Sequence, residues 1–330
     1  MLEHAARSVN TRPRWVRLVF ACATIAGSAC ALAEVSSAAE TPQLCEQGPA
    51  RGIPARAPGA ATGSEFARRV QDLSGLSRDA LARSELLTGD VPDFLRRLVP
   101  VTVAGFDGER PVKITVCVLP DYLALGSDTD FVRVPLGLKA ALDVARDFGF
   151  ILPTPKLVDA IYESSRVRLE PRPLPASDEM RSTAYFVYHN ELVDRERAEQ
   201  AAPLGELTAG DKKDLVLTSL LWRAPGRVAI YGWHRAVDQP IQPLSTVHGA
   251  RYADYSHGVR LVSTTAYVDG AKRSLEELLA DRKLSHLLTR EGSLPQLGEH
   301  LTALMAQLAE DERTASVAGL SRAGASAEFR

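Results

Sequence analysis

The residues best suited to chemistry gather in one stretch of the chain, between Lys212 and Arg260. Three of the seven histidines lie within 24 positions there, among tyrosines, a tryptophan, an aspartate and a serine. Core strands consist mainly of branched apolar residues, so a segment this rich in ionisable and aromatic side chains is typical of a cleft wall. The candidate catalytic residues are His234, His248, Asp254, Ser256 and His257, and the candidate substrate-binding residues are Tyr231, Trp233, Tyr252, Tyr255 and Arg260.

Three kinds of chemistry are open to this set. A histidine oriented by Asp254 can act as a general base that activates water or Ser256 for attack on an acyl or glycosyl centre. His234, His248 and His257 can instead bind a metal, although spacings of 14 and 9 residues match no recognised ligand pattern. In the third interpretation nothing is catalysed, and the side chains form a buried hydrogen-bond network or a stacking platform for a sugar. The sequence identifies no cofactor.

Two expected strands, Arg227–Trp233 and Val259–Thr265, position the histidines. His234 follows the first strand and His257 precedes the second, so antiparallel pairing would bring both imidazoles to one end of the sheet. His248 would project from the connection above that end. The sequence therefore predicts that the three imidazoles come together.

The whole chain predicts an α+β fold, with an antiparallel or mixed sheet and helices packed around it in one globular body, because strands and helices interleave without a regular βαβ rhythm. Further strands are expected at Val101–Ala104, Val112–Leu119, Ala184–Tyr188 and Asp214–Ser219, the first two joined by an Asp-Gly turn. Apolar spacing and breakers predict helices at Phe66–Leu76, Pro92–Leu98, Leu136–Phe148, Lys156–Ser164, Glu191–Ala201, Glu276–Leu279, Lys283–Leu288 and Leu297–Leu308.

The amino terminus has the layout of a secretory signal peptide. Four arginines against a single acid precede Leu18–Ala33, an uncharged run shorter than the roughly 20 apolar residues of a membrane-spanning helix. We expect cleavage near Ala33 and a secreted or periplasmic protein. The predicted organisation is a signal peptide over 1–33, a disordered linker over 34–64, a globular domain over 65–309 and a flexible tail over 310–330.

The sequence argues against nucleic acid as a partner and against a transmembrane segment after signal cleavage. Removal of four arginines and one glutamate with the signal leaves 35 basic and 40 acidic residues, whereas nucleic-acid binding calls for a clustered positive surface. No second apolar run is long enough for a transmembrane segment. Cys45 and Cys117 remain after cleavage, and they either form one disulfide or leave Cys117 as a small apolar residue in a strand.

Two other groups of polar residues stand out. Asp121, Asp128 and Asp130 lie in a loop that could hold a hard cation such as calcium, but ordinary turn chemistry explains them as well. Lys212 and Lys213 alternate at the start of a strand, so one faces solvent and the other can face the cleft. A lysine in the cleft would suit a carboxylate of the substrate.

Two resemblances add to this reading. The string Ser256-His257-Gly258, with His248-Gly249 upstream, resembles the active-site signature of L,D-transpeptidases, but Val259 stands where that family has its nucleophilic cysteine. Without the thiol, that chemistry is not available. More widely, the segments PDYLALGSD, LPTPK, YGWH, IQPLS and YADYSHGVRLV are similar to a group of exported bacterial proteins with no established activity. That resemblance implies export and transfers no catalytic role.

The leading hypothesis is an exported hydrolase that acts on a cell-envelope or extracellular polymer, peptidoglycan or polysaccharide, through a histidine-centred site. The alternative is a non-catalytic carbohydrate-binding or envelope protein, in which Tyr231, Trp233, Tyr252 and Tyr255 stack on sugar rings. A pocket with convergent imidazoles would favour the enzyme, and a flat exposed aromatic face would favour the binding protein.

Overall fold

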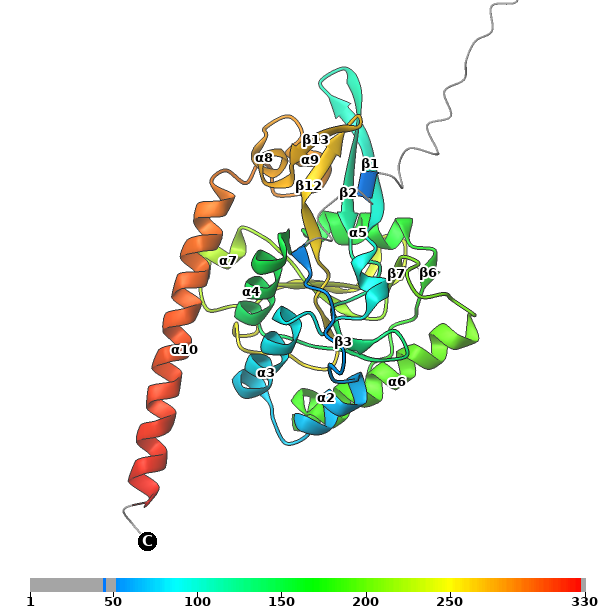
Figure 1. The fold of residues 1–330 in the computed structure, drawn as a ribbon. Coiled ribbons are helices and arrows are strands. Elements are labelled where there is room, and N and C mark those ends of the chain that lie inside the picture. Colours follow the sequence, from blue (N-terminus) through cyan, green and yellow to red (C-terminus); the bar gives the residue numbers. More distant parts are fainter. Residues whose placement is uncertain (1–43, 46–51, 328–330) are drawn as a thin grey trace, which may run out of the picture. The chain divides into compact units, whose positions relative to one another are not determined.

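A computed structural model describes residues 44–45 and 52–327, with side chains to residue 315. An antiparallel hairpin of β1 (Val99–Asp107) and β2 (Arg110–Val118) forms one side of the larger sheet, with β1 at its edge (Figure 1). The hairpin confirms both predicted strands and the Asp-Gly turn between them. On the other side of β2 lies β12 (Val262–Val268), which also pairs with β13 (Ala271–Ser274) and β5 (Phe150–Ile151).

A second sheet carries four of the ten candidate site residues, namely Tyr231, Trp233, His234 and His257. Its strand order is β10 (Gln239–Ser245), β9 (Ile230–Ala236), β8 (Lys213–Leu215) and β11 (His257–Gly258). The pair of β8 and β11 is parallel, and the other two pairs are antiparallel, so the sheet is mixed.

The predicted pairing of Arg227–Trp233 with Val259–Thr265 is wrong. β9 pairs with β8 and β10, whereas β12 belongs to the larger sheet. The connecting residues, Val259–Leu261, cross from one sheet to the other, and the carbonyls at their two ends accept hydrogen bonds from the N–H groups of Leu123 (2.8 Å) and Leu119 (3.0 Å). Those backbone bonds direct the chain toward β2 instead of β9.

Two predicted helices are confirmed at nearly their predicted bounds, α4 (Leu138–Phe148) and α5 (Pro155–Ser164). The Thr154 hydroxyl caps α5 by accepting from the N–H of Leu157. Pro155 occupies the first turn, where a backbone N–H would have no partner within the helix, so its missing N–H costs no hydrogen bond. Gly149 ends α4 with a φ of 79°, a left-handed conformation that glycine adopts without steric cost.

The predicted strand Ala184–Tyr188 is wrong, because these residues form the start of α6 (Thr183–Glu199). The Ser182 hydroxyl caps this helix through the N–H of Tyr185. Its buried face includes the polar residues His189 and Asn190 in addition to apolar ones. The second half of α6 confirms the predicted helix Glu191–Ala201, whereas the apolar pattern did not reveal the first half.

The remaining elements surround the two sheets. The predicted helix Phe66–Leu76 divides into α2 (Gly63–Arg69) and α3 (Gly75–Leu87), and Pro92–Leu98 contains the short 3-10 turn η2 (Asp93–Arg96). The other elements are β3 (Ala124–Ser127), β4 (Asp130–Arg133), β6 (Val167–Arg168), η3 (Asp178–Arg181), β7 (Thr208–Ala209), α7 (Leu220–Arg223), α8 (Leu275–Ala280), α9 (Ser285–Leu288) and α10 (Leu297–Ala327).

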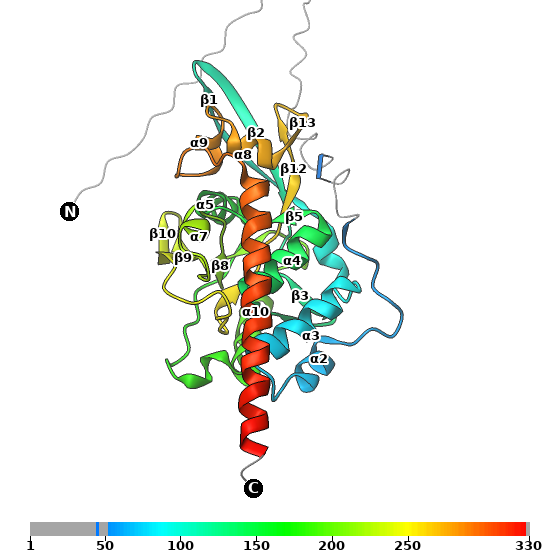
Figure 2. The ribbon, with the colours of Figure 1, turned by 90° about the vertical axis from the view of Figure 1, so that its left-hand side faces the viewer.

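The predicted signal peptide over 1–33 lies outside the described residues, as does much of the predicted linker. In the described part of the linker, Cys45 and Ile53 are buried in the core, and Cys45 forms a disulfide with Cys117. The boundary at 310 falls inside α10. This helix contacts α4 and α8 and continues to Ala327 (Figure 2).

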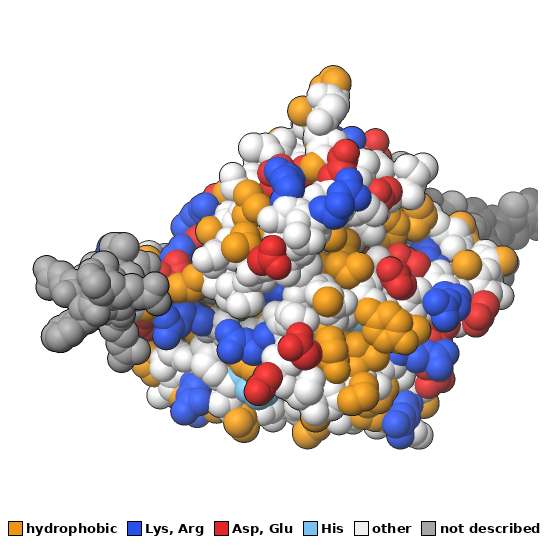
Figure 3. Space-filling view, turned by 90° about the horizontal axis from the view of Figure 1, so that it is seen from below, with side chains coloured by type: hydrophobic (Ala, Val, Ile, Leu, Met, Phe, Trp, Pro, Cys, Tyr) orange, Lys and Arg blue, Asp and Glu red, His pale blue; other side chains and the backbone are white. Residues whose placement is uncertain are grey.

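The described part of the chain is one globular α+β body, as predicted. Its main hydrophobic core includes residues of both sheets and of most helices. Within the ranges that the structure covers, no helix combines the length and apolar character needed to span a bilayer. The face shown in Figure 3 carries cationic, anionic and apolar side chains interspersed, without a dominant field of one sign.

Candidate functional site

The three candidate histidines do not form one cluster. His248 and His257 lie together, with ring centroids 6.4 Å apart. His234 is separated from them by β8, because Lys213 of β8 pairs with His257 on one side and with Gly232 of β9 on the other. The predicted meeting of all three imidazoles is therefore wrong, since it depended on pairing β9 with β12.

Asp254 is the most firmly held polar group near His257. One carboxylate oxygen accepts from the backbone N–H of Ser256 (2.8 Å) and from its hydroxyl (2.6 Å), and the other accepts from the hydroxyl of Tyr252 (3.1 Å). Burial alone would raise the pKa of Asp254, but His257 and the Ser256 donors hold that pKa below its usual range. The carboxylate is thus ionised and fixed, and the Ser256 hydroxyl is committed to it.

His257 is buried without a hydrogen-bond partner. Its side chain is 1% exposed, and no described residue bonds to either ring nitrogen. Its Nε2 lies 3.9 Å from an oxygen of Asp254, beyond hydrogen-bond range. Burial lowers the pKa of His257 to about 4, against the opposing effect of Asp254, so the imidazole is neutral at pH 7. Leaving a buried polar group unpaired costs roughly 1–3 kcal/mol, and a catalytic role is one reason to retain such a group.

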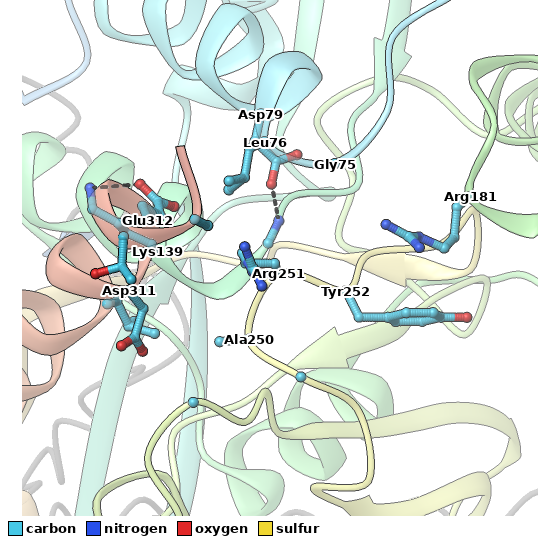
Figure 4. Close-up of a pocket in the computed structure, with 16 residues that line it drawn as sticks. Gly75, Leu76, Asp79, Lys139, Arg181, Ala250, Arg251, Tyr252, Asp311 and Glu312 are labelled. Carbon is cyan, nitrogen blue, oxygen red and sulfur yellow. Dashed lines mark hydrogen bonds and ion pairs between the residues drawn. The ribbon is translucent and has the colours of Figure 1, made fainter. Parts of the chain in front are cut away.

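Tyr252 separates His257 from a cavity of about 710 Å³. Its ring meets His257 edge-on at 5.7 Å between centroids and stacks on His248 at 4.0 Å. The guanidinium of Arg181 lies 5.6 Å from the Tyr252 ring centroid. Both Tyr252 and Arg181 line the cavity (Figure 4), so one aromatic ring stands between this space and the imidazole.

The cavity is bounded by α3, the start of α4, the segment 249–252 and α10. Its wall combines charges of both signs, carried by Asp79, Lys139, Arg181, Arg251, Asp311 and Glu312. In Figure 4 the acids of α10 lie on one side, Asp79 reaches down from α3, and Arg181 lies above the ring of Tyr252. No local pattern in the sequence indicates this cavity, because its walls come from distant parts of the chain.

The two lysines at the start of β8, Lys212 and Lys213, have different environments. Lys212 is buried, donates to the carbonyl of Tyr255 (2.7 Å) and lies 3.0 Å from Nδ1 of His189. Burial lowers the pKa of Lys212 to about 8. Lys213 is partly exposed, lies 4.8 Å from the ring centroid of Trp233 and acts electrostatically on His257. Both lysines lower the pKa of His257, and Lys213 has the larger effect of the two.

His234 belongs to a second polar cluster, around Asp159 of α5. One oxygen of Asp159 contacts His234 Nε2 and the Tyr231 hydroxyl, both at 2.9 Å, and the other contacts Arg290 at 2.5 Å. Burial would raise the pKa of Asp159, but these hydrogen bonds hold that pKa below its usual range. The His234 ring also stacks on Tyr162 at 4.7 Å. His234 therefore joins β9 to α5, which is a structural role.

Most of the candidate substrate-binding residues are buried. Tyr231, Trp233 and Tyr255 are each less than one-tenth exposed, so they offer no open ring face to a sugar. Arg260 is fully buried and donates to two backbone carbonyls. Of the five residues in this set, Tyr252 alone lines the cavity described above.

A buried ionic network, which the sequence reading missed, lies behind the site. Arg133 and Asp121 are each 1% exposed and pair at 2.7 Å, and Arg197 lies 3.4 Å from the same carboxylate. Burial would raise the pKa of Asp121, but Arg133 and the other arginines hold it below its usual range. Arginines inside apolar runs, such as Arg133 and Arg260, are the sequence signal that could have revealed this network.

The three loop acids have protein partners, most of them in other segments of the chain. Asp121 is paired with arginine, Asp128 accepts from the N–H of Phe94 (3.0 Å), and Asp130 accepts from the N–H of Ser64 (2.9 Å). Across the residues with described side chains, no group of three or more His, Cys, Asp or Glu is arranged to hold a metal ion. The predicted metal set of His234, His248 and His257 is likewise not assembled.

Comparisons of the chain with protein-family models, curated proteins and solved structures found no match. The two resemblances noted in the sequence therefore stay predictions, and the argument for function rests on the site itself.

Proposed function

We propose that this protein is a hydrolase in which His257 accepts a proton from an attacking water, and that its substrate is an envelope or extracellular polymer, peptidoglycan or polysaccharide. One observation carries the proposal. The neutral imidazole of His257 has no bonding partner in the described chain, stands beside the fixed carboxylate of Asp254, and is one ring away from the cavity. A general base needs a free lone pair within reach of substrate and water.

The proposed reaction gives each neighbouring group a role. His257 takes a proton from water as the water oxygen bonds to the acyl or glycosyl carbon. The bond from that carbon to the leaving group then breaks, and the imidazolium gives its proton to the leaving group. Asp254 stabilises the imidazolium formed in between, and Lys213 favours negative charge that develops nearby. Ser256 is not the nucleophile, because its hydroxyl donates to Asp254. Substrate reaches the imidazole when the Tyr252 ring shifts.

The compartment proposed for this activity is outside the cytoplasm. The signal-like amino terminus supports export. The Cys45–Cys117 disulfide adds support, because such bonds persist mainly in oxidising compartments. An envelope or extracellular polymer is the substrate that such a protein would meet.

A second candidate is a non-catalytic binding protein of the envelope. It is favoured by the complete burial of His257, since a ligand could occupy the cavity without reaching the imidazole. Its original form, a platform of stacked aromatic rings, loses support because Tyr231, Trp233 and Tyr255 are buried.

The first prediction tests His257 directly. We expect His257→Ala to lower the rate of release of soluble fragments from peptidoglycan or polysaccharide by roughly a hundredfold or more, because the proton acceptor is lost. Ser256→Ala should have the smaller effect, since the backbone N–H of Ser256 and the Tyr252 hydroxyl still hold Asp254. His286→Ala, at an exposed histidine, is the matched control and should keep full activity.

Thermal melts of the same variants separate the alternatives. Full turnover of His257→Ala with an unchanged melt would leave the binding protein as the better hypothesis. Loss of the folded state would instead assign His257 a structural role. Loss of activity with an unchanged melt supports the hydrolase.

A further inference from the structure

The cavity beside Tyr252 has an unsatisfied acid in its wall. Asp79 of α3 is 5% exposed, and one of its oxygens accepts from the N–H of Gly137 at the start of α4 (2.9 Å). The other oxygen has no hydrogen-bond partner among the described residues. Figure 4 shows this carboxylate reaching from α3 into the space above Arg251. A buried carboxylate oxygen in this position can accept from a cationic group of a ligand.

Two arginines supply the complementary charge. The guanidinium of Arg181 is held over the ring of Tyr252, and Arg251 lies in the segment that forms the floor of the cavity (Figure 4). Among the residues with described side chains, neither guanidinium forms a hydrogen bond or a close ion pair, although Arg181 acts electrostatically on Asp79 and Arg251 on Glu312. Guanidinium groups bind carboxylates through paired hydrogen bonds, so these two can receive an anionic group.

We propose that this cavity binds a peptide through charged groups of both signs, with Asp79 receiving a free amino group and Arg251 and Arg181 receiving a free carboxylate. This inference rests on the proposed function and deepens it, because it names the peptide part of an envelope polymer as the substrate class. A neutral polysaccharide would leave Asp79, Arg251 and Arg181 without charged partners, and unpaired charges in a binding site lower affinity.

The test measures binding of tri-alanine, N-acetyl-tri-alanine and tri-alanine amide to the full secreted chain by isothermal titration calorimetry. We expect tri-alanine to bind, and each blocked form to bind at least about tenfold more weakly, because each has lost one charged contact. Tri-alanine is a probe of the two charged ends and not the physiological substrate.

Matched variants assign each end of the peptide to its residue. Asp79→Asn keeps an acceptor for the N–H of Gly137, and should weaken tri-alanine about tenfold without weakening the acetylated form further. Arg251→Gln should weaken tri-alanine about tenfold without weakening tri-alanine amide further. Glu277→Gln and Arg282→Gln, at exposed positions on and after α8, are the controls and should leave all three affinities unchanged.

The outcomes separate this inference from the proposed function. Absence of tri-alanine binding at millimolar concentration overturns the inference, as does equal binding of free and blocked peptides, or a variant that weakens both forms alike. In each case hydrolysis of a polymer that depends on His257 would leave the hydrolase proposal intact. Conversely, Asp79→Asn and Arg251→Gln could change the peptide affinities as expected while His257→Ala keeps full activity. That result would overturn the hydrolase proposal alone.

Discussion

At the scale of single residues, the arrangement around Asp254 decides which side chain can act. Three donors fix its carboxylate, and one of them is the hydroxyl of Ser256. The Ser256 hydroxyl donates to this carboxylate, whose low pKa makes it a weak base, and not to the imidazole, so the geometry of a serine nucleophile is absent here. His257 keeps both nitrogens free of described partners, and we therefore propose it as the proton acceptor.

Asp79 carries a cost to stability that a binding role would explain. Burial raises the pKa of Asp79 to about 6, while Arg78 and Arg181 lower it and Glu312 raises it. Because the folded pKa is above the unfolded one, the folded state binds more protons between about pH 4 and pH 6, and its stability falls as the pH rises through that window. Above pH 7 the whole cost, on the order of 3 kcal/mol, is present.

The second prediction follows from that sign. We expect Asp79→Asn to raise the melting temperature by a few degrees at pH 8 and to leave it nearly unchanged at pH 4, where the native carboxyl is also neutral. Calorimetric melts of both proteins at the two pH values test this. A variant that is less stable at pH 8 would mean that the charge of Asp79 supports the fold, contrary to the argument from burial.

The sequence could place part of the site at this scale. His248, Tyr252, Asp254 and His257 lie within ten positions, so their proximity needs only local chain geometry. Asp79 has no such signal, because it is one polar residue in a helix, and its importance arises from contacts with α4 and the cavity.

At the scale of elements, the reliability of the prediction followed the polarity of the buried face. α4 and α5 bury mainly apolar side chains at helical spacing, and both were predicted. α6 buries His189, Asn190 and Arg197 as well, so only its second half is predicted as a helix, and its aromatic start has the pattern of a strand. The pairing error had a different cause, since β12 has partners in the larger sheet that only the tertiary fold defines.

The third prediction concerns α10 as a wall of the cavity. Leu297, Leu304 and Leu308 pack this helix into the core, whereas the residues from Asp311 to Ala315 contribute to the cavity. A chain that ends at Ala309 should therefore keep its melt within a few degrees but bind tri-alanine at least about tenfold more weakly. Calorimetric titration and thermal melts measure the two effects.

A chain that ends at Ser316 is the control for that truncation. It keeps every residue that lines the cavity, and it should bind tri-alanine as the full chain does. Equal loss of binding in both truncated chains would show that the effect comes from the distal part of α10 and not from the cavity wall.

At the scale of the whole molecule, the site forms where distant segments meet. The cavity combines α3, the start of α4, the segment 249–252 and α10, which are separated by long stretches of sequence. No local pattern encodes such a meeting, whereas the fold class follows from the interleaving of helices and strands and was predicted correctly. His248 and His257 thus form one candidate site with the cavity only through the tertiary structure.

The last prediction concerns the Cys45–Cys117 disulfide, which ties the segment around Cys45 to β2 across a sequence separation of 72 residues. Closing a loop of this length lowers the entropy of the unfolded chain, and in the chain-entropy model stabilises the fold by about 4 kcal/mol. We expect Cys45→Ser with Cys117→Ser to lower the melting temperature clearly, and a reducing agent to lower that of the native protein but not that of the double variant. Because neither Cys45 nor Cys117 lines the cavity, binding of tri-alanine at 25 °C should be kept by the folded double variant. An unchanged melting temperature on reduction would mean that core packing, and not the covalent bond, holds this segment in place.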